Sequence, residues 1–310
     1  MRLTNCGLRR IGHWWAVGIV AVWVSALATH AQDAEPPADS PKKESPPRRI
    51  VTIAPNAAEM IHMLGAGDRV VGVSKFCAYP PDLLSLPRVG GLFDPDLERI
   101  IALRPDLVVL RGRCPTLEEL CDKQGIKVYR DRTESLTDMQ RTIRELGAIL
   151  NQADRAEEIV RSFQEHLSRI RRRVAGRSRP RVFVTASRRP GELASIMTFN
   201  RNTFVHEMIE IAGGDNVFAD HDMNYPTISL EAVLARNVAF IIELMPAEKN
   251  PDSLESRVRT EWSRFDAIPA VAGGHVHVIT DDASVIPSPR CAVVIEKISL
   301  ILHPESSSGR

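Results

Sequence analysis

A helix–strand unit that occurs twice constrains the fold of this 310-residue chain more than any other feature of its sequence. The stretch PDLERIIALRPDLVVL, residues 95–110, returns as SLEAVLARNVAFIIEL, residues 229–244, and the two align without a gap. A second pair precedes them in the same order, with EMIHMLGAGDRVV at 59–71 and EMIEIAGGDNVF at 207–218. Two similar α/β lobes are therefore predicted, one in each half of the chain.

Apolar runs alternate with amphipathic segments in both halves, a pattern typical of βαβ units with parallel strands. In the first half, strands are expected at 49–55, 69–74, 107–111 and 127–131, with helices that start near Asn56, Asp96, Pro115 and Ser135. In the second half, strands are expected at 181–187, 216–220, 240–244 and 275–280, with helices near 202–213, 229–236, 251–265 and 290–302. The predicted fold class is α/β, with two Rossmann-like lobes that each contain a parallel sheet.

One long amphipathic helix is predicted between the two halves, from about Ala153 to Val174. Its apolar residues recur at steps of three and four and form one stripe, namely Ala153, Ala156, Val160, Phe163, Leu167, Ile170 and Val174. At ~1.5 Å per residue the rod is on the order of 33 Å long, enough to cross from one lobe to the other. The alternative is an ordinary packing helix of a single domain. The predicted division is an N-terminal lobe at 49–151, the connecting helix at 152–176 and a C-terminal lobe at 177–305.

The amino terminus is predicted to be a signal peptide, residues 1–28, followed by a disordered Pro-rich linker at 29–48. Three arginines precede the apolar stretch 16–28, which ends in Ala-Leu-Ala. About 13 apolar residues are short for a bilayer span, although an uncleaved anchor remains the alternative. Export would place the mature chain in the oxidising periplasm, where the connectivity of its four cysteines stays open. These are Cys77, Cys114, Cys121 and Cys291, and a bridge between the first two is conceivable.

The overall charge argues against a nucleic-acid partner. The chain has 40 Lys and Arg against 39 Asp and Glu, so it lacks the basic footprint of a nucleic-acid-binding protein. The sequence also lacks a complete set of residues for a metal site or for a hydrolase active site. His275 and His277 would share one face of a strand but have no well-placed third ligand. The stretch from Gly72 to Phe76 lacks the second glycine of a nucleophile elbow, and we predict neither catalytic nor metal-binding residues.

Several motifs in a fixed order resemble one family. They include RIVTIAPNAAEMIHMLGAGDRVVGVS, YPPD, VGG, DLERIIALRPDLVV, AGGDNVF, YPTISLEAVLARN and SPR, and the match runs from Arg49 to about Pro304. The chain resembles the periplasmic substrate-binding proteins of cobalamin and ferric-siderophore ABC importers. The resemblance implies a soluble monomer without a cofactor of its own. It implies capture of cobalamin or a related corrinoid between the lobes, and delivery to an inner-membrane permease with its ATPase subunits.

Two other functions remain open at this stage. A ferric siderophore or haem is the runner-up ligand, because Tyr79 and Tyr225 would serve as phenolate ligands to iron. A secreted enzyme is the hypothesis from a different class, and turnover of a corrinoid or ester substrate would favour it over stoichiometric binding.

The ligand-binding residues are expected in loops that follow strands, because ligands of open α/β sheets bind outside the carboxyl ends of the strands. These loops contain Phe93, Arg111 and Phe199, and also the stretch from Ser187 to Arg189. The resemblance adds ligand contacts at Phe76, Tyr79, Tyr225, Asp282 and Arg290. Arg111 stands where these relatives have a cleft tryptophan. Each aromatic has packing within its own lobe as its alternative, and Arg290 has a salt bridge to Asp282.

One carboxylate occupies the same position of the repeated unit in each lobe. Glu98 follows an expected helix cap at Asp96, and Glu231 follows one at Ser229. An acid in the first turn complements the helix dipole, which is worth about 0.3 to 1 kcal/mol. The resemblance implies a second role, in which this pair docks on arginines of the two permease subunits.

Overall fold

The structure, a computed structural model, describes residues 45–304 except 187, 189, 190, 192, 194 and 247–250, and the side chains of 251 and 252. The predicted signal peptide, most of the linker, and Ser187 and Arg189 of the predicted cleft lie outside the described residues. Within the described part, no helix combines the length and the apolar character needed to cross a membrane.

The first lobe is built on a four-stranded parallel sheet with the strand order β2-β1-β3-β4. Its strands are β1 (Ile50–Thr52), β2 (Val70–Val73), β3 (Leu107–Arg111) and β4 (Lys127–Asp131). Its helices are α1 (Pro55–Met63), α2 (Leu97–Ala102), α3 (Pro115–Lys123) and α4 (Leu136–Ile149), with short 3₁₀ turns η1 (Gly67–Arg69) and η2 (Pro81–Leu83). Each predicted helix and strand begins within a few residues of its prediction. The strands β1 and β3 are the clearest cases, because their apolar residues are buried on both faces of the sheet.

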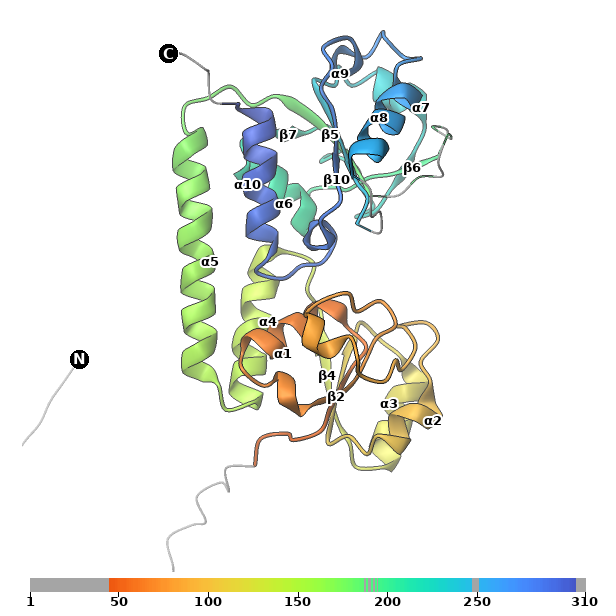
Figure 1. The fold of residues 1–310 in the computed structure, drawn as a ribbon, viewed down its shortest axis with the longest axis vertical. Coiled ribbons are helices and arrows are strands. Elements are labelled where there is room, and N and C mark those ends of the chain that lie inside the picture. The colour runs from red at the N-terminus through yellow and green to blue at the C-terminus, as the bar shows by residue number, and fades with distance from the viewer. Residues whose placement is uncertain are drawn as a thin grey trace, which may run out of the picture. The chain divides into compact units, whose positions relative to one another are not determined.

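The second lobe repeats this plan with the strand order β10-β9-β5-β7, again all parallel. Its sheet contains β5 (Arg181–Thr185), β7 (Asp215–Asn216), β9 (Phe240–Leu244) and β10 (Val276–Ile279). Its helices are α6 (Phe204–Ile211), α7 (Leu230–Leu234), α8 (Pro251–Trp262), α9 (Pro269–Ala272) and α10 (Cys291–Leu302), with the 3₁₀ turn η3 (Asp282–Ser284). The α/β prediction with two parallel sheets is confirmed (Figure 1).

Three details of the second lobe differ from the prediction, and the first is the short helix α9, which was not expected. The strand expected at 216–220 ends after Asn216, because the Asn216 side chain accepts a bond from Phe218 N and donates one to Phe199 O, which turns the chain. The antiparallel pair β6 (Ile196–Met197) and β8 (Thr227–Ile228) was not predicted. Each of its strands has only two residues, too few for an alternating pattern to be recognised.

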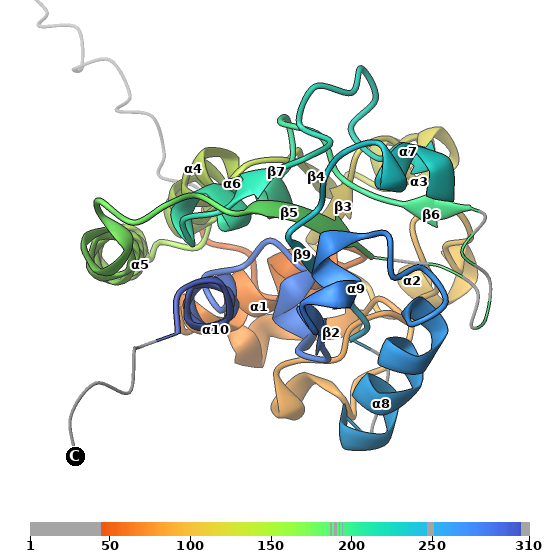
Figure 2. The same cartoon turned by 90° about the horizontal axis from the view of Figure 1, so that it is seen from above.

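The helix α5 (Ala153–Val174) has the bounds that the apolar stripe predicts. Figure 1 shows it running along one side of both lobes, and Figure 2 shows it beside α4, α6 and α10, away from α2 and α7. Its buried residues are Ala156, Ile159, Val160, Phe163, Leu167 and Ile170. They belong to one apolar cluster that includes Ile50 of the first sheet and Val182 of the second, so a single core continues from lobe to lobe.

We expect ligand binding to change the separation of the lobes only slightly. A continuous core along a straight helix bends less readily than a loop hinge. Small-angle scattering of the mature protein should give nearly the same radius of gyration with and without ligand. A large fall in the radius on binding would contradict this expectation.

Candidate ligand-binding site

The candidate site is a cavity of about 280 Å³ at the carboxyl ends of the strands, where residues of both lobes meet. Pro55, Asn56 and Arg111 contribute from the first lobe. The second lobe contributes Ala186, Met197, Phe199, Phe204, Tyr225, Val285, Ile286 and Pro287. The walls are thus mostly apolar with a few polar groups, the usual composition of a small-molecule site. Three of the predicted residues, Arg111, Phe199 and Tyr225, line this cavity.

A hydrogen-bonded cluster crosses from one lobe to the other at this cavity. The Tyr225 hydroxyl donates to Glu134 Oε2 at 2.6 Å, and Arg111 Nη2 donates to Glu134 Oε1 at 2.9 Å. Burial and the Glu134 carboxylate both raise the pKa of Tyr225. The Tyr225 ring also packs edge-on against Phe199, with the ring centroids 6.0 Å apart. Tyr225 is therefore held as a neutral phenol with a fixed ring plane.

A buried carboxylate orients the polar groups on the first-lobe side of the cavity. Asp131, at the end of β4, is fully buried and accepts a bond from Asn56 Nδ2 at 2.7 Å. It also accepts a bond from the backbone N–H of Thr133 at 3.1 Å and lies 3.8 Å from Arg111 Nη1. These bonds direct the Asn56 amide, so its carbonyl oxygen is the atom left to accept a bond at the cavity. The pair of Asn56 and Arg111 thus presents an acceptor and a donor.

A second cluster forms around Arg290, which contacts two other predicted residues, Asp282 and Tyr79. Its guanidinium donates to Asp282 Oδ1 at 2.6 Å and to Asp282 Oδ2 at 3.2 Å, as the salt-bridge alternative expected. The same group lies 3.8 Å from the centroid of the Tyr79 ring. It also donates to Glu59 Oε1 at 3.0 Å. Because Glu59 lies on α1 and Arg290 directly precedes α10, this ion pair also joins the two lobes.

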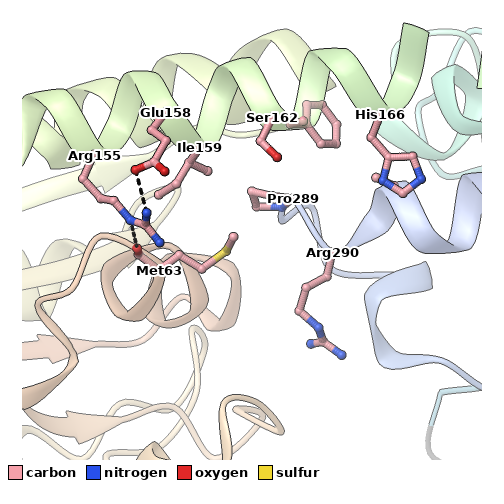
Figure 3. Close-up of a pocket in the computed structure, with 10 residues that line it drawn as sticks. Met63, Arg155, Glu158, Ile159, Ser162, His166, Pro289 and Arg290 are labelled. Atoms are coloured by element: carbon pink, nitrogen blue, oxygen red, sulfur yellow. Dashed lines mark hydrogen bonds and ion pairs between the residues drawn. The ribbon is translucent and has the colours of Figure 1, made fainter. Parts of the chain in front are cut away.

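Arg290 also lines a separate cavity of about 330 Å³ bordered by α5, α1 and the start of α10. Figure 3 shows the Arg290 side chain pointing away from α5, with Met63 of α1 on the other side of the cavity. Arg155 of α5 donates to Glu158 and to the Met63 carbonyl, which fastens α5 to the first lobe (Figure 3). The structure thus places Arg290 beside the connecting helix, and Arg290 does not line the cavity that Tyr225 borders.

Glu59 is the least expected charged group of the site. Its side chain is 1% exposed and stands among Ala57, Ala58, Met60 and Ile61, all of them buried. Burial raises the pKa of Glu59 to about 7, although Ser288 and Arg290 both favour its charged form. The group therefore changes charge near neutral pH, and its charged form is the one that pairs with Arg290.

Two predicted aromatic residues stay on the surface. Phe93 is 96% exposed and Phe76 is 64% exposed, and Lys75 Nζ lies 5.1 Å from the centroid of the Phe76 ring. Neither ring is buried in the core of its lobe, although the Phe76 ring lies against Gly91 and Lys75 of the same lobe. Both lie in loops that follow β2, and they offer unoccupied apolar surface.

Sequence reasoning missed Glu59 and Glu134. Glu134 follows β4 and belongs to the same class of post-strand loop as the residues that were chosen. Glu59 is a lone acid inside an apolar helical turn, and a buried charge of this kind requires a partner. Both signals were present in the sequence.

The cysteines and histidines form no further site in the described part of the chain. Cys77, Cys114, Cys121 and Cys291 are all free and buried, and the bridge considered between Cys77 and Cys114 is absent. The two thiols belong to different apolar clusters, which keeps them apart. His275 stacks on Phe240, and no described group of three His, Cys, Asp or Glu residues is arranged to hold a metal ion.

The two repeated glutamates, Glu98 and Glu231, are exposed on short helices. Asp96 caps α2 by accepting from Arg99 N at 3.0 Å, and Ser229 caps α7 by accepting from Ala232 N at 3.4 Å, so both predicted caps are confirmed. Figures 1 and 2 show α2 and α7 on the side of the molecule opposite α5, one on each lobe. Among the described residues, neither glutamate forms an ion pair.

The sequence profile of the periplasmic binding protein family matches residues 50–283. The vitamin B12-binding protein of Pectobacterium carotovorum is 29% identical over 272 residues, which cover 85% of this chain and 92% of that protein. The crystal structure of the periplasmic vitamin B12-binding protein of Vibrio cholerae superposes with a TM-score of 0.71 at 26% identity. The superposition covers 84% of this chain and 98% of that one.

A haem-binding relative shares the same fold. The periplasmic heme-binding protein of Pseudomonas aeruginosa has a TM-score of 0.71 at 22% identity, with coverage of 84% and 94%. This likeness is informative about the fold alone. The chain belongs to the periplasmic binding protein family. Its class of function is that of a substrate-binding component of an ABC importer, in a family of binding proteins rather than enzymes.

We expect Glu59→Gln to remove a pH dependence of stability. Glu59 loses its proton near pH 4.5 when unfolded, but its folded pKa is about 7. Its contribution to stability is therefore complete below pH 4.5 and is lost as the pH rises through 7. At about 1.4 kcal/mol per pKa unit, the wild type should lose about 2 to 3 kcal/mol from this group between about pH 5 and pH 8.

Urea unfolding at both pH values measures this difference. The Glu59→Gln variant should lack this part of the decline, whereas the control Glu98→Gln, at an exposed residue, should follow the wild type. Parallel pH profiles of the wild type and Glu59→Gln would show that Glu59 does not titrate in the folded protein.

Proposed function

We propose that the protein captures cobalamin or a related corrinoid between its lobes and delivers it to an inner-membrane ABC permease with its ATPase subunits. We further propose that residues 1–28 direct its export to the periplasm, where it works as a monomer without a cofactor or chemistry of its own. The support comes from relatives that bind vitamin B12 and align with this chain across nearly their whole length. A cavity lined by both lobes is consistent with them.

The bonding of Tyr225 is the observation that favours a corrinoid over ferric iron or haem. A phenolate ligand to iron must lose its proton, but burial and the Glu134 carboxylate raise the pKa of Tyr225. The described residues that line the cavity include no histidine or cysteine as another iron ligand. Cobalamin brings its cobalt with both equatorial and axial ligands in place, so it needs an aromatic surface and hydrogen bonds from the protein and no metal ligand.

The polar groups of the site match the edge of a corrinoid. Its flat macrocycle carries amide side chains, which both donate and accept hydrogen bonds. Arg111 offers donors, Asn56 Oδ1 and Glu134 offer acceptors, and Tyr225, which packs on the buried Phe199, offers aromatic surface. The cavity of about 280 Å³ is smaller than the ligand. We infer that the ligand occupies it in part and extends across the strand ends toward the loop after β2, where Phe76 is exposed and Tyr79 stacks on Arg290.

Calorimetric titration of the mature protein with cyanocobalamin, haemin and a ferric hydroxamate siderophore tests the proposal. We expect one cyanocobalamin per chain, recovered unchanged after release, and weaker binding of the two iron compounds. Tight binding of haemin or the siderophore with no binding of cyanocobalamin would make the runner-up ligand the correct one. Conversion of the recovered ligand would indicate an enzyme.

Tyr225→Phe separates the aromatic role from the phenolate role. The variant keeps the ring against Phe199 but loses the bond to Glu134. Because that bond ties the lobes in the absence of ligand, we expect cyanocobalamin affinity to stay within about threefold of the wild type. Such a change is below the ~1 kcal/mol of an ordinary hydrogen bond. An abolished affinity for an iron compound, with a lost tyrosinate absorption band, would instead identify Tyr225 as an iron ligand.

We also propose that Glu98 and Glu231 dock on the permease. Both are exposed, and neither has a described ionic partner inside the protein, so each is available to an external cation. Two equivalent charges on one side of a two-lobed molecule suit a permease made of two similar subunits. Charge pairs of this kind orient the encounter and increase its rate.

The double variant Glu98→Lys/Glu231→Lys should fold and bind ligand normally but fail to support uptake in cells. Charge reversal on the permease should restore uptake, because the pairing would be re-formed with opposite signs. Undiminished transport by the double variant would contradict docking through these residues and leave helix-dipole stabilisation as their role.

A further inference from the structure

We propose that Ile101 and Leu234 are apolar contacts for the same permease, each one turn after a docking carboxylate. This inference rests on the proposed permease docking but adds residues to which neither the sequence nor the relatives assign a role. The surface it defines consists of Glu98 and Ile101 on α2 and Glu231 and Leu234 on α7. We call it the paired docking surface.

The repeated unit places the two apolar side chains at equivalent positions. Counting from the first residue of α2 and of α7, the carboxylate is second and the apolar residue is fifth in both helices. Residues three apart lie on one helix face. The fourth residue, Ile100 or Val233, is fully buried in both helices and fixes which face points outward. Carboxylate and apolar side chain are therefore presented together in each lobe.

Both apolar side chains are exposed. Ile101 is 36% exposed and Leu234 is 41% exposed, and each belongs to the small set of large hydrophobic residues that the described chain leaves at its surface. A single exposed leucine is ordinary in a soluble protein. An exposed large apolar residue at the same position of both repeats is less easily explained as a chance surface residue. The two helices do not share every residue, because the third residue is Arg99 in α2 and Ala232 in α7. The shared carboxylate and apolar residue are therefore not a consequence of identical sequences.

An exposed ion pair binds a partner more strongly when an apolar contact lies beside it. An ion pair in water contributes only about 0 to 1 kcal/mol, so two carboxylates alone would hold a large partner weakly. An apolar contact beside each pair removes water from it, which strengthens the electrostatic attraction and adds the free energy of apolar burial. A ring of contacts that excludes water is typical of the residues that dominate binding energy.

Charge and symmetry identify the occupant of this surface. A partner must offer a cation next to an apolar patch, and it must do so twice, at the spacing of α2 and α7 on one side of the molecule. Two periplasmic faces of a two-subunit permease satisfy both conditions. A second copy of this chain would not, because it would bring glutamate against glutamate.

Ile101→Ser/Leu234→Ser tests the inference, with Val293→Ser/Leu300→Ser as the matched control. Val293 and Leu300 are 48% and 42% exposed on α10, which lies beside α5 and away from α2 and α7. Spheroplasts of the source bacterium that lack the gene receive purified protein loaded with radiolabelled cyanocobalamin. We expect the Ile101/Leu234 variant to require roughly tenfold more protein for half-maximal uptake, with unchanged ligand affinity, because two apolar contacts are lost. The control should match the wild type.

A second measurement separates this inference from the ligand proposal. Fluorescently labelled, ligand-free protein is bound to right-side-out membrane vesicles of the same strain, so that the result does not depend on which ligand is transported. Saturable binding that the Ile101/Leu234 variant weakens and the control does not would support the paired docking surface. Equal binding by the variant and the wild type, while Glu98→Lys/Glu231→Lys fails, would overturn the inference but keep the carboxylates. No saturable binding by the wild type would overturn both.

Discussion

The packing of α5 against both lobes is the constraint on which the rest of the structure depends. Its buried stripe, with Phe163 near its middle, joins the sheet residues Ile50 and Val182 in one apolar cluster. Without it the lobes would be separate domains joined by loops, with weak and variable contacts across the cleft. With it, the carboxyl ends of two parallel sheets face each other at a fixed separation. Residues of both lobes then line one cavity.

Several polar bonds add to the connection between the lobes, and two of those formed by side chains differ in kind. Tyr225 and Glu134 form a hydrogen bond between a neutral phenol and a carboxylate at the ligand cavity. Arg290 and Glu59 form an ion pair beside α5, and burial raises the pKa of Glu59 to about 7. The first bond lines the proposed ligand cavity, whereas the strength of the second depends on the protonation of Glu59.

The sequence alone predicts much of the fold because its signals are long and periodic. The stripe of α5 and the apolar runs of β1 and β3 each span enough residues to identify the element. The pair of β6 and β8 was missed because two-residue strands have no period. The site was predicted in part, since the position after a strand identified Arg111 and the resemblance to the family identified Tyr225. The sequence could not show that Glu134 joins Arg111 to Tyr225, or that Glu59 pairs with Arg290, which is 231 residues away. Such contacts depend on how the two lobes face each other.

Hydrogen–deuterium exchange with and without cyanocobalamin tests most directly the claim that a ligand is held between the two lobes. We expect protection in both lobes at the strand ends, at residues 74–79 and 111–113 of the first and 225–228 and 282–290 of the second. We expect little change along α5, whose bonds are already present in the free protein. Protection confined to one lobe, or strongest along α5 and α8, would contradict it.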